Sequence, residues 1–546
     1  MFCGVMSAEI AGVEAVPVRV EADLSDGLPF FAVVGYVSSQ VKEAQDRVKT
    51  ALKNQGLVLP PKRMIINLAP GDIRKEGTRF DLPIAAAILA ALGKIPAEPL
   101  SRMMVLGELH LDGGVGGVRG ILPSVRKARE LGLEVCVVPA ENYREGSLVE
   151  GIQVVGVRDA GEFLRYCREG RAQGPSALGK EETEPGYEVD FSDLQGQDAV
   201  KRAVLIAAAG FHNLLMEGPP GAGKSMAARR IPTILPELTR EESLELTQIY
   251  SVAGLLPAGD PLIRRRPFRA PHHTLSPQAL CGGGRLPVPG EISLAHRGVL
   301  FLDELPEVSR RTLELLRQPM EEKQIVLSRT AGTFRFPADF MLVGAMNPCP
   351  CGCYPDLRRC TCTPADIYRY RKRISQPLLD RIDLAVQVPP LKYEELRYGR
   401  RKGLDSAAMR GAVVRAAKLQ RERYRGKDFS FNSSLGAKEI SVYCPLTGEG
   451  ERLLESAYQK LELSARSYHK VIKVARTIAD LEGEEVIGEG NISEALCYRA
   501  GERKGVKRYE EAYILWKEPS RIPSKAEGSG KPSGRTLCAG ETAGSG

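Results

Sequence analysis

The sequence predicts an α/β protein in which a parallel sheet carries a phosphate-binding loop and is followed by a helical C-terminal region. An apolar run at residues 214–216 precedes the glycine-rich segment GPPGAGKS at residues 218–225, and a helix-forming run follows it. A second apolar run, at residues 299–302, ends in Asp303 and Glu304. From residue 392 to about residue 513 the apolar spacing is helical. Strand, glycine-rich turn and helix in this order are typical of nucleotide-binding α/β domains.

The glycine-rich segment is a candidate phosphate-binding loop. Its glycines allow the backbone N–H groups and the start of the following helix to point at a phosphate. Lys224 is placed to reach the β- and γ-phosphates, and Ser225 to offer its hydroxyl to Mg²⁺. The loop consists of Gly218, Pro219, Pro220, Gly221, Ala222, Gly223, Lys224 and Ser225.

The acidic pair after the second apolar run supplies the other half of such a site. Asp303 is expected to hold the Mg²⁺ shell and Glu304 to polarise the attacking water. Alone, a glycine-rich turn is often only a turn, and an acidic pair after a strand is often only a solvated helix start. The conjunction of the two motifs predicts a protein that binds and hydrolyses ATP.

Three further residues are candidates for the catalytic step. Asn347 follows a strand-like run at residues 340–345, where its amide can orient the lytic water. Arg381 lies at a helix end and can stabilise the transferring phosphoryl group in a neighbouring subunit, although spacing alone fits an ordinary surface arginine equally well. Arg466 begins a long helix and can reach the γ-phosphate, and a capping or ion-pairing arginine is its alternative.

Composition limits the class of protein. The chain has 546 residues, a net charge of +8 and 12 cysteines, and its length suggests about three or four domains. The longest apolar run, residues 82–92, is too short to span a bilayer, and the first residues lack the pattern of a secretory signal. We therefore expect a cytoplasmic protein whose cysteines are thiols or metal ligands. The mildly basic charge permits polyanion binding.

We expect an N-terminal domain of mixed strands and helices at residues 1–168. Its predicted elements are strands at residues 30–34, 64–68 and 135–139, a helix at 39–55 and a hairpin at 109–118. The remaining segments are a flexible linker at 169–189, an ATPase domain at 190–390, a helical domain at 391–517 and a disordered tail at 518–546.

A cysteine cluster follows Asn347. Its pattern is C-x-C, eight intervening residues and C-x-C, formed by Cys349, Cys351, Cys360 and Cys362, with Cys353 as a spare. Four thiolates make a complete tetrahedral zinc shell, whereas clustered cytoplasmic thiols can also stay reduced without a metal. In contrast, His272 and His273 are expected to belong to a structured insertion and not to a metal site.

A basic hairpin is the candidate DNA-binding element. Strand-like runs at residues 325–327 and 333–336 flank a turn around residues 330–332. Lys323, Arg329 and Arg335 can be carried by this hairpin into the pore of a ring, where they would bind phosphates without reading bases. A solvated basic hairpin is the alternative.

Taken together, these residues resemble an AAA+ ATPase of the magnesium-chelatase-like group, of the ComM or YifB type. The resemblance also rests on DLQGQ at 193–197, FRAPHHT at 268–274, NPCPCG at 347–352, LDRID at 379–383 and ARSYHKVIKVARTIADL from residue 465. It implies a hexameric ring that moves on branched or single-stranded DNA with little sequence preference and promotes branch migration in recombination or natural transformation. It also implies an arginine finger in trans for Arg381 and a sensor role, from a helical lid, for Arg466.

The N-terminal domain resembles the α+β domain of Lon-type proteases, but its catalytic dyad is not recognisable. A serine and a lysine must lie in hydrogen-bond reach for the lysine to activate the nucleophile. In this sequence Arg79 stands at the nucleophile position and Leu122 at the lysine position. Thr78 and Lys127 are nearby, and a shift of the comparison by one residue is all that would restore them as candidates. We expect a non-catalytic scaffold or a DNA-contacting collar.

Three functions follow from these observations. The leading hypothesis is a DNA-translocating ATPase of the branch-migration helicase type. The second is the motor subunit of a metal chelatase, and the third is an ATP-dependent protease. The absent dyad argues against the protease, and the fused N-terminal domain with its cysteine cluster argues against a dedicated chelatase motor.

Overall fold

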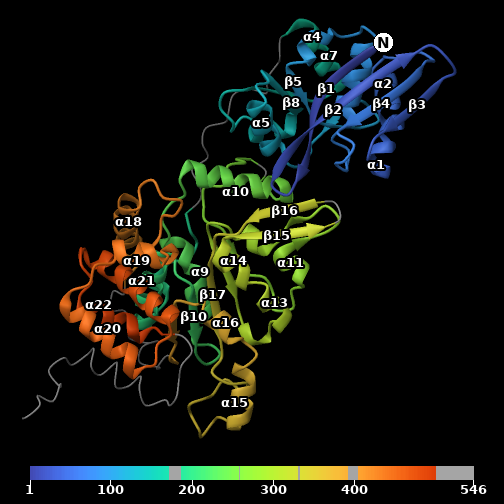
Figure 1. Cartoon of the computed structure of the whole chain (residues 1–546). Coiled ribbons are helices and arrows are strands. Elements are labelled where there is room, and N and C mark those ends of the chain that lie inside the picture. Colours follow the sequence, from blue (N-terminus) through green and yellow to red (C-terminus); the bar gives the residue numbers. More distant parts are fainter. Residues whose placement is uncertain (171–185, 258, 330–331, 391–403, 500–546) are drawn as a thin grey trace, which may run out of the picture. The chain divides into compact units, whose positions relative to one another are not determined.

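The computed structural model describes residues 1–170, 186–257, 259–329, 332–390 and 404–499 (Figure 1). Two larger sheets organise these residues, one built from strands up to residue 157 and one from strands that begin at residue 214 or later. Most of the predicted linker, the predicted tail at 518–546 and both ends of the predicted helical domain at 391–517 lie outside the described residues.

A mixed seven-stranded sheet forms the N-terminal part, in the order β3-β4-β2-β1-β5-β8-β9. The first two strands pair antiparallel over their full length, while β5, β8 and β9 run parallel to one another. The strands are β1 (Phe2–Ala11), β2 (Glu14–Ser25), β3 (Phe30–Val34), β4 (Arg63–Ala69), β5 (Met103–Val105), β8 (Val135–Pro139) and β9 (Gln153–Val157).

Helices cover this sheet, and α3 (Asp81–Ala91) is buried along its whole length. Because α3 consists of alanine, leucine, isoleucine and a proline after Asp81, it has no polar face to expose. The apolar run at residues 82–92 is therefore a core helix, and none of the described helices is both long and apolar enough to cross a membrane. The other elements are α1 (Ser39–Lys42), α2 (Ala44–Asn54), α4 (Ala97–Leu100), β6 (Glu108–Leu109), β7 (Val115–Gly116), α5 (Ile121–Glu130), α6 (Tyr143–Gly146) and α7 (Ala160–Glu169).

The predicted N-terminal strands are confirmed with small changes at their ends, and the predicted hairpin is the pair β6 and β7. The helix predicted at residues 39–55 is instead two helices. The chain tightens at Glu43, whose carbonyl accepts a hydrogen bond of 3.1 Å from the N–H of Asp46, three residues later. The amphipathic spacing continues across this break, so the sequence pattern did not reveal it.

A five-stranded parallel sheet forms the second part, in the order β11-β14-β17-β10-β18. Its strands are β10 (Leu214–Glu217), β11 (Phe268–Arg269), β14 (Val299–Leu302), β17 (Met341–Met346) and β18 (Leu384–Gln387). Leu214 at the start of β10 pairs with Val343 on one side and Leu384 on the other. Because the strands are parallel, their carboxyl ends share one edge of the sheet, here called the carboxyl edge, and their starts share the opposite amino edge.

Helices and two small hairpins surround the parallel sheet. Among them, α9 (Lys224–Ile234) begins directly after the glycine-rich loop, and the hairpin of β15 (Gln324–Arg329) and β16 (Gly332–Pro337) is the one predicted from the sequence. The others are α8 (Asp198–Gly210), α10 (Arg240–Ala253), α11 (Pro277–Cys281), β12 (Gly282–Gly283), β13 (Val288–Pro289), α12 (Glu291–Leu294), α13 (Arg310–Glu314), α14 (Arg317–Glu322), α15 (Pro364–Arg371) and α16 (Gln376–Leu379).

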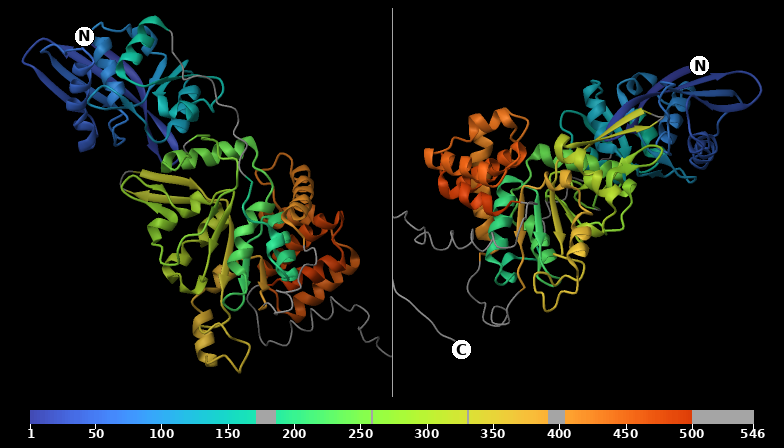
Figure 2. Two further views of the ribbon diagram at one scale, coloured as in Figure 1. Left: turned by 180° about the vertical axis from the view of Figure 1, so that it is seen from behind. Right: turned by 60° about the horizontal axis from the view of Figure 1, so that its bottom comes forward.

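The C-terminal described residues are helical, as predicted. The helices are α18 (Ser406–Arg423), α19 (Ala437–Tyr443), α20 (Gly448–Lys460), α21 (Ala465–Glu482) and α22 (Glu489–Cys497). Helix α21 begins at the expected place, because the Ser464 hydroxyl caps it by accepting from the N–H of Ser467. Helices α18 and α21 pack on α8, and all three share one apolar core with the parallel sheet. Figure 2 shows the C-terminal helices, in orange and red, beside green elements of the second part.

Candidate active site

The glycine-rich loop connects β10 to α9 at the carboxyl edge of the parallel sheet. The strand ends at Glu217 and the helix starts at Lys224, so the loop is the tight turn that the sequence predicted. At Gly218 a Cβ atom would lie 2.2 Å from the carbonyl oxygen of Val388, which no side chain tolerates. The first N–H groups of α9 lack partners within the helix and therefore face the position of a bound phosphate.

The Lys224 side chain is mostly buried beneath this loop. Its Nζ donates to the carbonyl oxygens of Gly218 at 2.6 Å and Pro219 at 2.9 Å, and to Oδ1 of Asn347 at 3.0 Å. Burial lowers the pKa of Lys224, while the charges of Asp303 and Glu304 oppose that shift. Lysine and predicted sensor are thus brought together, although they are 123 residues apart in the chain.

The two predicted magnesium ligands are also brought together. Ser225 Oγ donates to Oδ2 of Asp303 at 2.7 Å, which joins the start of α9 to the end of β14. A hydroxyl and a carboxylate are the oxygen donors that Mg²⁺ accepts, with water and phosphate oxygens filling its remaining positions. The donor set therefore fits the ion predicted from the sequence.

Glu304 follows Asp303 in a left-handed backbone conformation, with φ of 48°. This conformation is costly for a residue with a Cβ atom and is concentrated at functional sites. The Glu304 side chain is 52% exposed, and its Oε2 lies 3.4 Å from Nδ1 of His273. Glu304 is therefore accessible to water, as a residue that activates water must be.

His273 and Gln197 are site residues that the sequence did not identify. His273 reaches Glu304, and its ring lies beside that of His272, tilted by 33° with centroids 4.1 Å apart. Gln197 Nε2 donates to the carbonyl of Ala222 in the phosphate-binding loop at 3.2 Å and to that of Pro389 at 2.7 Å. Both residues lie in the segments FRAPHHT and DLQGQ, which carried the family resemblance without an assigned role.

Arg381 and Arg466 meet at the amino edge. Asn213 immediately precedes β10, and its Nδ2 donates to the carbonyl of Arg381 at 3.0 Å. The phosphate-binding loop leaves the other end of β10, whose four residues span about 13 Å. Both arginines bind one carboxylate: Arg381 Nη2 lies 2.7 Å from Oε2 of Glu321, and Arg466 pairs with Oε1 of the same residue.

Glu321, on α14, is another residue that the sequence did not identify. Burial would raise its pKa, but the hydrogen bonds from Arg381 and Arg466 outweigh burial and lower the pKa. Glu321 therefore stays ionised between the two arginines. The three side chains line one cavity of about 330 Å³.

The basic hairpin carries two of its three predicted residues. Arg329 and Arg335 are exposed on β15 and β16. Lys323 lies before β15, at the base of the hairpin, in a left-handed conformation. Its ammonium is 3.2 Å from Oδ1 of Asp339 and also donates to Ser434 Oγ, so Lys323 is already engaged at the base.

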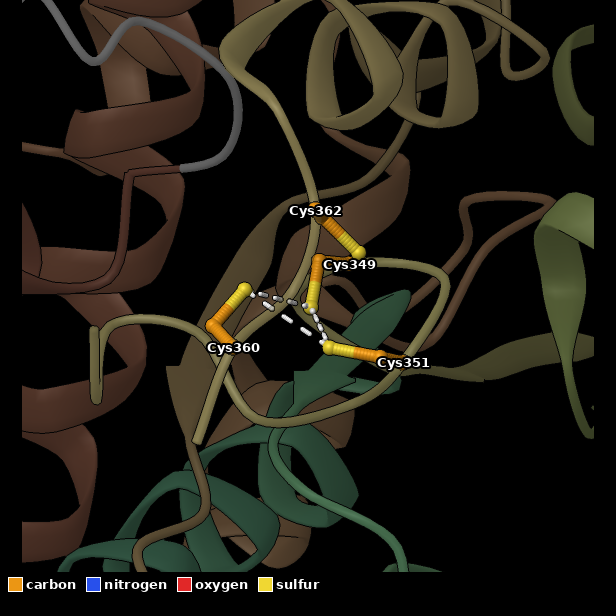
Figure 3. A group of neighbouring side chains, drawn as sticks. All are labelled: Cys349, Cys351, Cys360 and Cys362. Atoms are coloured by element: carbon orange, nitrogen blue, oxygen red, sulfur yellow. Dashed lines mark hydrogen bonds between the residues drawn. The ribbon is translucent and has the colours of Figure 1, made fainter. Parts of the chain in front are cut away.

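The four predicted cysteine ligands converge beside Asn347. The sulfur atoms of Cys349, Cys351, Cys360 and Cys362 all lie within 4.8 Å of one another. Figure 3 shows the four side chains directed toward a common centre. Cys353 is set apart from this group, because its thiol donates to the carbonyl of Cys351.

The candidate protease residues are not arranged as a dyad. The Thr78 hydroxyl donates to Oε2 of Glu108 at 2.7 Å, and the Lys127 ammonium binds Glu130 at 2.6 Å. The Arg79 guanidinium is buried and donates to the carbonyl of Arg119 at 2.8 Å. Each side chain is thus committed to a structural partner.

Comparison with known proteins agrees with this geometry. The family model described as "Magnesium chelatase, subunit ChlI" matches residues 190–396, its C-terminal counterpart matches residues 403–499, and the model "Subunit ChlI of Mg-chelatase" matches residues 20–142. The chain is 44% identical to "Competence protein ComM" of Haemophilus influenzae over 91% of its length and 97% of the relative's.

Two further relatives extend the comparison. The chain is 42% identical to "Uncharacterized protein YifB" of Escherichia coli over 90% of its length and 96% of that protein. It is 26% identical to "Magnesium-chelatase 38 kDa subunit" of Rhodobacter capsulatus over 58% of its length and 87% of that subunit. The similarity to the first two proteins therefore includes the N-terminal sheet, the parallel sheet and the C-terminal helices.

Proposed function

Because this chain belongs to the ComM/YifB family of magnesium-chelatase-like AAA+ ATPases, we propose that it is a hexameric, ATP-driven DNA motor of the branch-migration helicase type. The observation that carries the proposal is the division of catalytic groups between two edges of one sheet. A phosphate-binding loop and its acidic residues occupy the carboxyl edge, while two arginines occupy the amino edge.

ATP hydrolysis at the carboxyl edge uses five side chains in distinct roles. Lys224 would bind the β- and γ-phosphates, and Ser225 and Asp303 would hold Mg²⁺, which would neutralise charge on the phosphates. Glu304 accepts hydrogen bonds from the attacking water and directs its lone pair at the γ-phosphorus. Asn347, bonded to Lys224, orients that water from the neighbouring strand.

Arg381 and Arg466 act on the nucleotide of another subunit. An arginine side chain of about 7 Å cannot cross the length of β10 to its own phosphate-binding loop. A head-to-tail arrangement, in which the amino edge of one chain faces the carboxyl edge of the next, brings both arginines to the γ-phosphate. Repetition of this heterologous contact closes a ring, and the hexamer is the ring size that the family implies.

DNA is the proposed substrate of movement. Arg329 and Arg335 present positive charge on an exposed hairpin. This hairpin follows directly after α14, which carries Glu321, the partner of Arg381 and Arg466. Such contacts bind branched or single-stranded DNA through phosphates, with little sequence preference. The similarity to a protein named for competence supports a cytoplasmic role in recombination or natural transformation. We also include Zn²⁺ among the cofactors, at the four converging thiols.

A metal-chelatase motor subunit is the second candidate, and the similarity to a magnesium-chelatase subunit of Rhodobacter capsulatus favours it. That function shares the ATPase and the ring but needs no DNA contact. The basic hairpin therefore distinguishes the two candidates. Thr78 binds Glu108 and Lys127 binds Glu130, so these side chains do not support a third candidate, an ATP-dependent protease.

The deciding experiment measures ATP hydrolysis with forked, single-stranded and duplex DNA, together with migration of a labelled three- or four-way junction. The Glu304→Gln protein is the control for contaminating helicases. We expect DNA to stimulate ATP hydrolysis. We also expect the labelled junction to migrate only when ATP and active protein are both present. If the protein hydrolyses ATP but neither binds DNA at low salt nor moves a junction, the DNA motor is wrong and the chelatase-type motor takes its place.

A further inference from the structure

We propose that Cys349, Cys351, Cys360 and Cys362 hold one structural Zn²⁺ and that this ion keeps Asn347 in position for ATP hydrolysis. The proposal has two parts, the metal site itself and its coupling to the active site. The second part rests on the proposed ATPase mechanism, whereas the first depends only on the cysteine loop.

The spacing of the sulfur atoms fits a zinc shell. Cys349 Sγ lies 3.4 Å from Cys351 Sγ and 3.8 Å from Cys360 Sγ, and the latter two are 3.6 Å apart. With Zn–S bonds of about 2.3 Å, the edge of a ZnS₄ tetrahedron is about 3.8 Å. The fourth sulfur, of Cys362, lies within 4.8 Å of the other three, so small adjustments close the shell.

The surroundings of the thiols resemble those of a structural site. Cys349 is fully buried, and its sulfur accepts a hydrogen bond from the N–H of Tyr354 at 3.4 Å. Backbone N–H donors of this kind stabilise a thiolate and orient it toward a metal. With four protein ligands the coordination is closed, which is typical of zinc that supports structure and does not react.

The loop needs such a cross-link because little else holds it. Between the end of β17 at Met346 and the start of α15 at Pro364 there is no helix or strand. Most side chains from residue 351 to residue 363 are exposed or half-buried, and Leu357 is 80% exposed. A loop of this length without an apolar core is poorly ordered unless another interaction fixes it.

The same loop contacts the nucleotide site at two points. Cys349 follows Asn347 by two residues, and Asn347 accepts a hydrogen bond from Lys224. At Gly352 a Cβ atom would lie 2.6 Å from Cδ of Pro220, so the backbone of the cysteine loop packs directly on the phosphate-binding loop. Zinc bound between the two C-x-C segments therefore fixes the chain directly C-terminal to Asn347.

The test begins with metal analysis of the full-length protein, purified without chelators or added zinc. We expect about one zinc per chain. The double variant Cys349→Ser and Cys362→Ser removes one ligand from each segment and should lose the metal. Cys353→Ser is the matched control in the same loop, and it should keep both the zinc and the wild-type ATP turnover. Addition of Co²⁺ to the apo wild type should give the visible absorption of tetrahedral cobalt thiolate.

Coupling is read from two further measurements on the same proteins. In the double variant, amide hydrogen exchange of residues 347–352 should accelerate, while binding of an ATP analogue changes little because β10 and α9 are held by the core. ATP turnover should fall by about tenfold or more, toward the loss of about 10² to 10³ expected when an orienting hydrogen-bond donor is removed. Retained binding of the ATP analogue and an unchanged midpoint of global thermal unfolding show that the variant is folded.

The outcomes separate the two parts. Absence of stoichiometric zinc in fresh wild-type protein, together with no cobalt thiolate absorption, overturns the metal site. Zinc loss with unchanged amide exchange and unchanged turnover overturns the coupling. If the wild type binds zinc but does not hydrolyse ATP, the proposed function fails, while metal content and amide exchange still decide the zinc site.

Discussion

The two edges of the parallel sheet differ in how much of the active site a single chain completes. At the carboxyl edge two hydrogen bonds within the chain join Lys224 to Asn347 at 3.0 Å and Ser225 to Asp303 at 2.7 Å. At the amino edge Arg381 and Arg466 both bind the carboxylate of Glu321 and not a phosphate. The carboxyl edge has its nucleotide-binding side chains in place within one chain. At the amino edge, the two arginines would have to separate from Glu321 before they could bind a phosphate.

Under the proposed mechanism, this difference places control of ATP hydrolysis at the amino edge. Binding depends on side chains that one chain positions by itself. In the proposed mechanism, hydrolysis also requires arginines that leave Glu321 and approach a neighbouring copy, so the rate would report on assembly of the ring. Because α14 carries Glu321 and leads into the basic hairpin, the proposed DNA motor would transmit a change at the amino edge to the DNA.

The strongest test of this division mixes two inactive variants. Arg381→Ala retains its nucleotide site but lacks the arginine for its neighbour, whereas Lys224→Ala lacks nucleotide binding but retains the arginine. Mixed rings should recover hydrolysis at the junctions where an intact Arg381 meets an intact Lys224. A supplied arginine increases the rate by about 10³ to 10⁵, so even partial recovery is measurable by phosphate release.

The control for this mixture is the Arg381→Ala and Lys224→Ala double variant mixed with Lys224→Ala, which contains no intact binding site. Verified mixed rings that show no more activity than this control would mean that Arg381 does not act in trans. The division between the two edges would then need another explanation.

The second test removes the water-activating group and leaves the rest of the carboxyl edge intact. Glu304→Gln should bind ATP with wild-type affinity but lower turnover by about 10² to 10⁴, because an amide is a much weaker acceptor for the water proton. Analogue binding and single-turnover hydrolysis measure the two effects. Glu307→Gln, three residues later and paired with Arg373, is the matched control. Rapid turnover by the Glu304 variant would contradict its role.

The carboxyl edge was largely predictable from the sequence. Gly218 to Ser225 and the acidic pair Asp303 and Glu304 are contiguous motifs whose chemistry depends on local geometry, namely a strand end and a helix start. Asn347 followed from the same rule, because strands that are parallel bring their carboxyl ends to one edge. The family and its fold could therefore be recognised before the structure was known.

The amino edge was not predictable in the same way. Glu321 is one acidic residue of a short helix, and only tertiary packing brings it between Arg381 and Arg466. At the carboxyl edge, the contact of His273 with Glu304 was missed for the same reason. Lys323 lies just before the first strand of the hairpin, and its ammonium is engaged there by Asp339 and Ser434. These contacts come from tertiary packing, so the sequence did not reveal them.

The third test concerns the hairpin that extends from the amino edge. Neutralising Arg329 and Arg335 together with glutamine should weaken DNA binding at physiological salt and lower its salt dependence by up to about two units of slope, one for each lost phosphate contact. Fluorescence anisotropy over a range of salt concentrations measures the slope. Neutralising Lys438 and Lys460, which are exposed on the C-terminal helices, controls for net charge. An equal loss in both double variants would indicate general electrostatic attraction and not a hairpin site.

The smallest expected effect comes from the carboxylate that holds the two arginines. In the proposed mechanism Arg381 and Arg466 each leave Glu321 before they reach a γ-phosphate, and a partly exposed ion pair contributes about 1 kcal/mol or less. Glu321→Gln keeps the side-chain shape but removes the charge, so the ATP concentration for half-maximal hydrolysis should fall by about fivefold. Glu322→Gln, in the next position and bonded to Gln318, is the control and should leave that concentration unchanged. A rise in half-saturating ATP together with lower maximal turnover would mean that Glu321 positions the arginines for catalysis and does not compete with the phosphate for them.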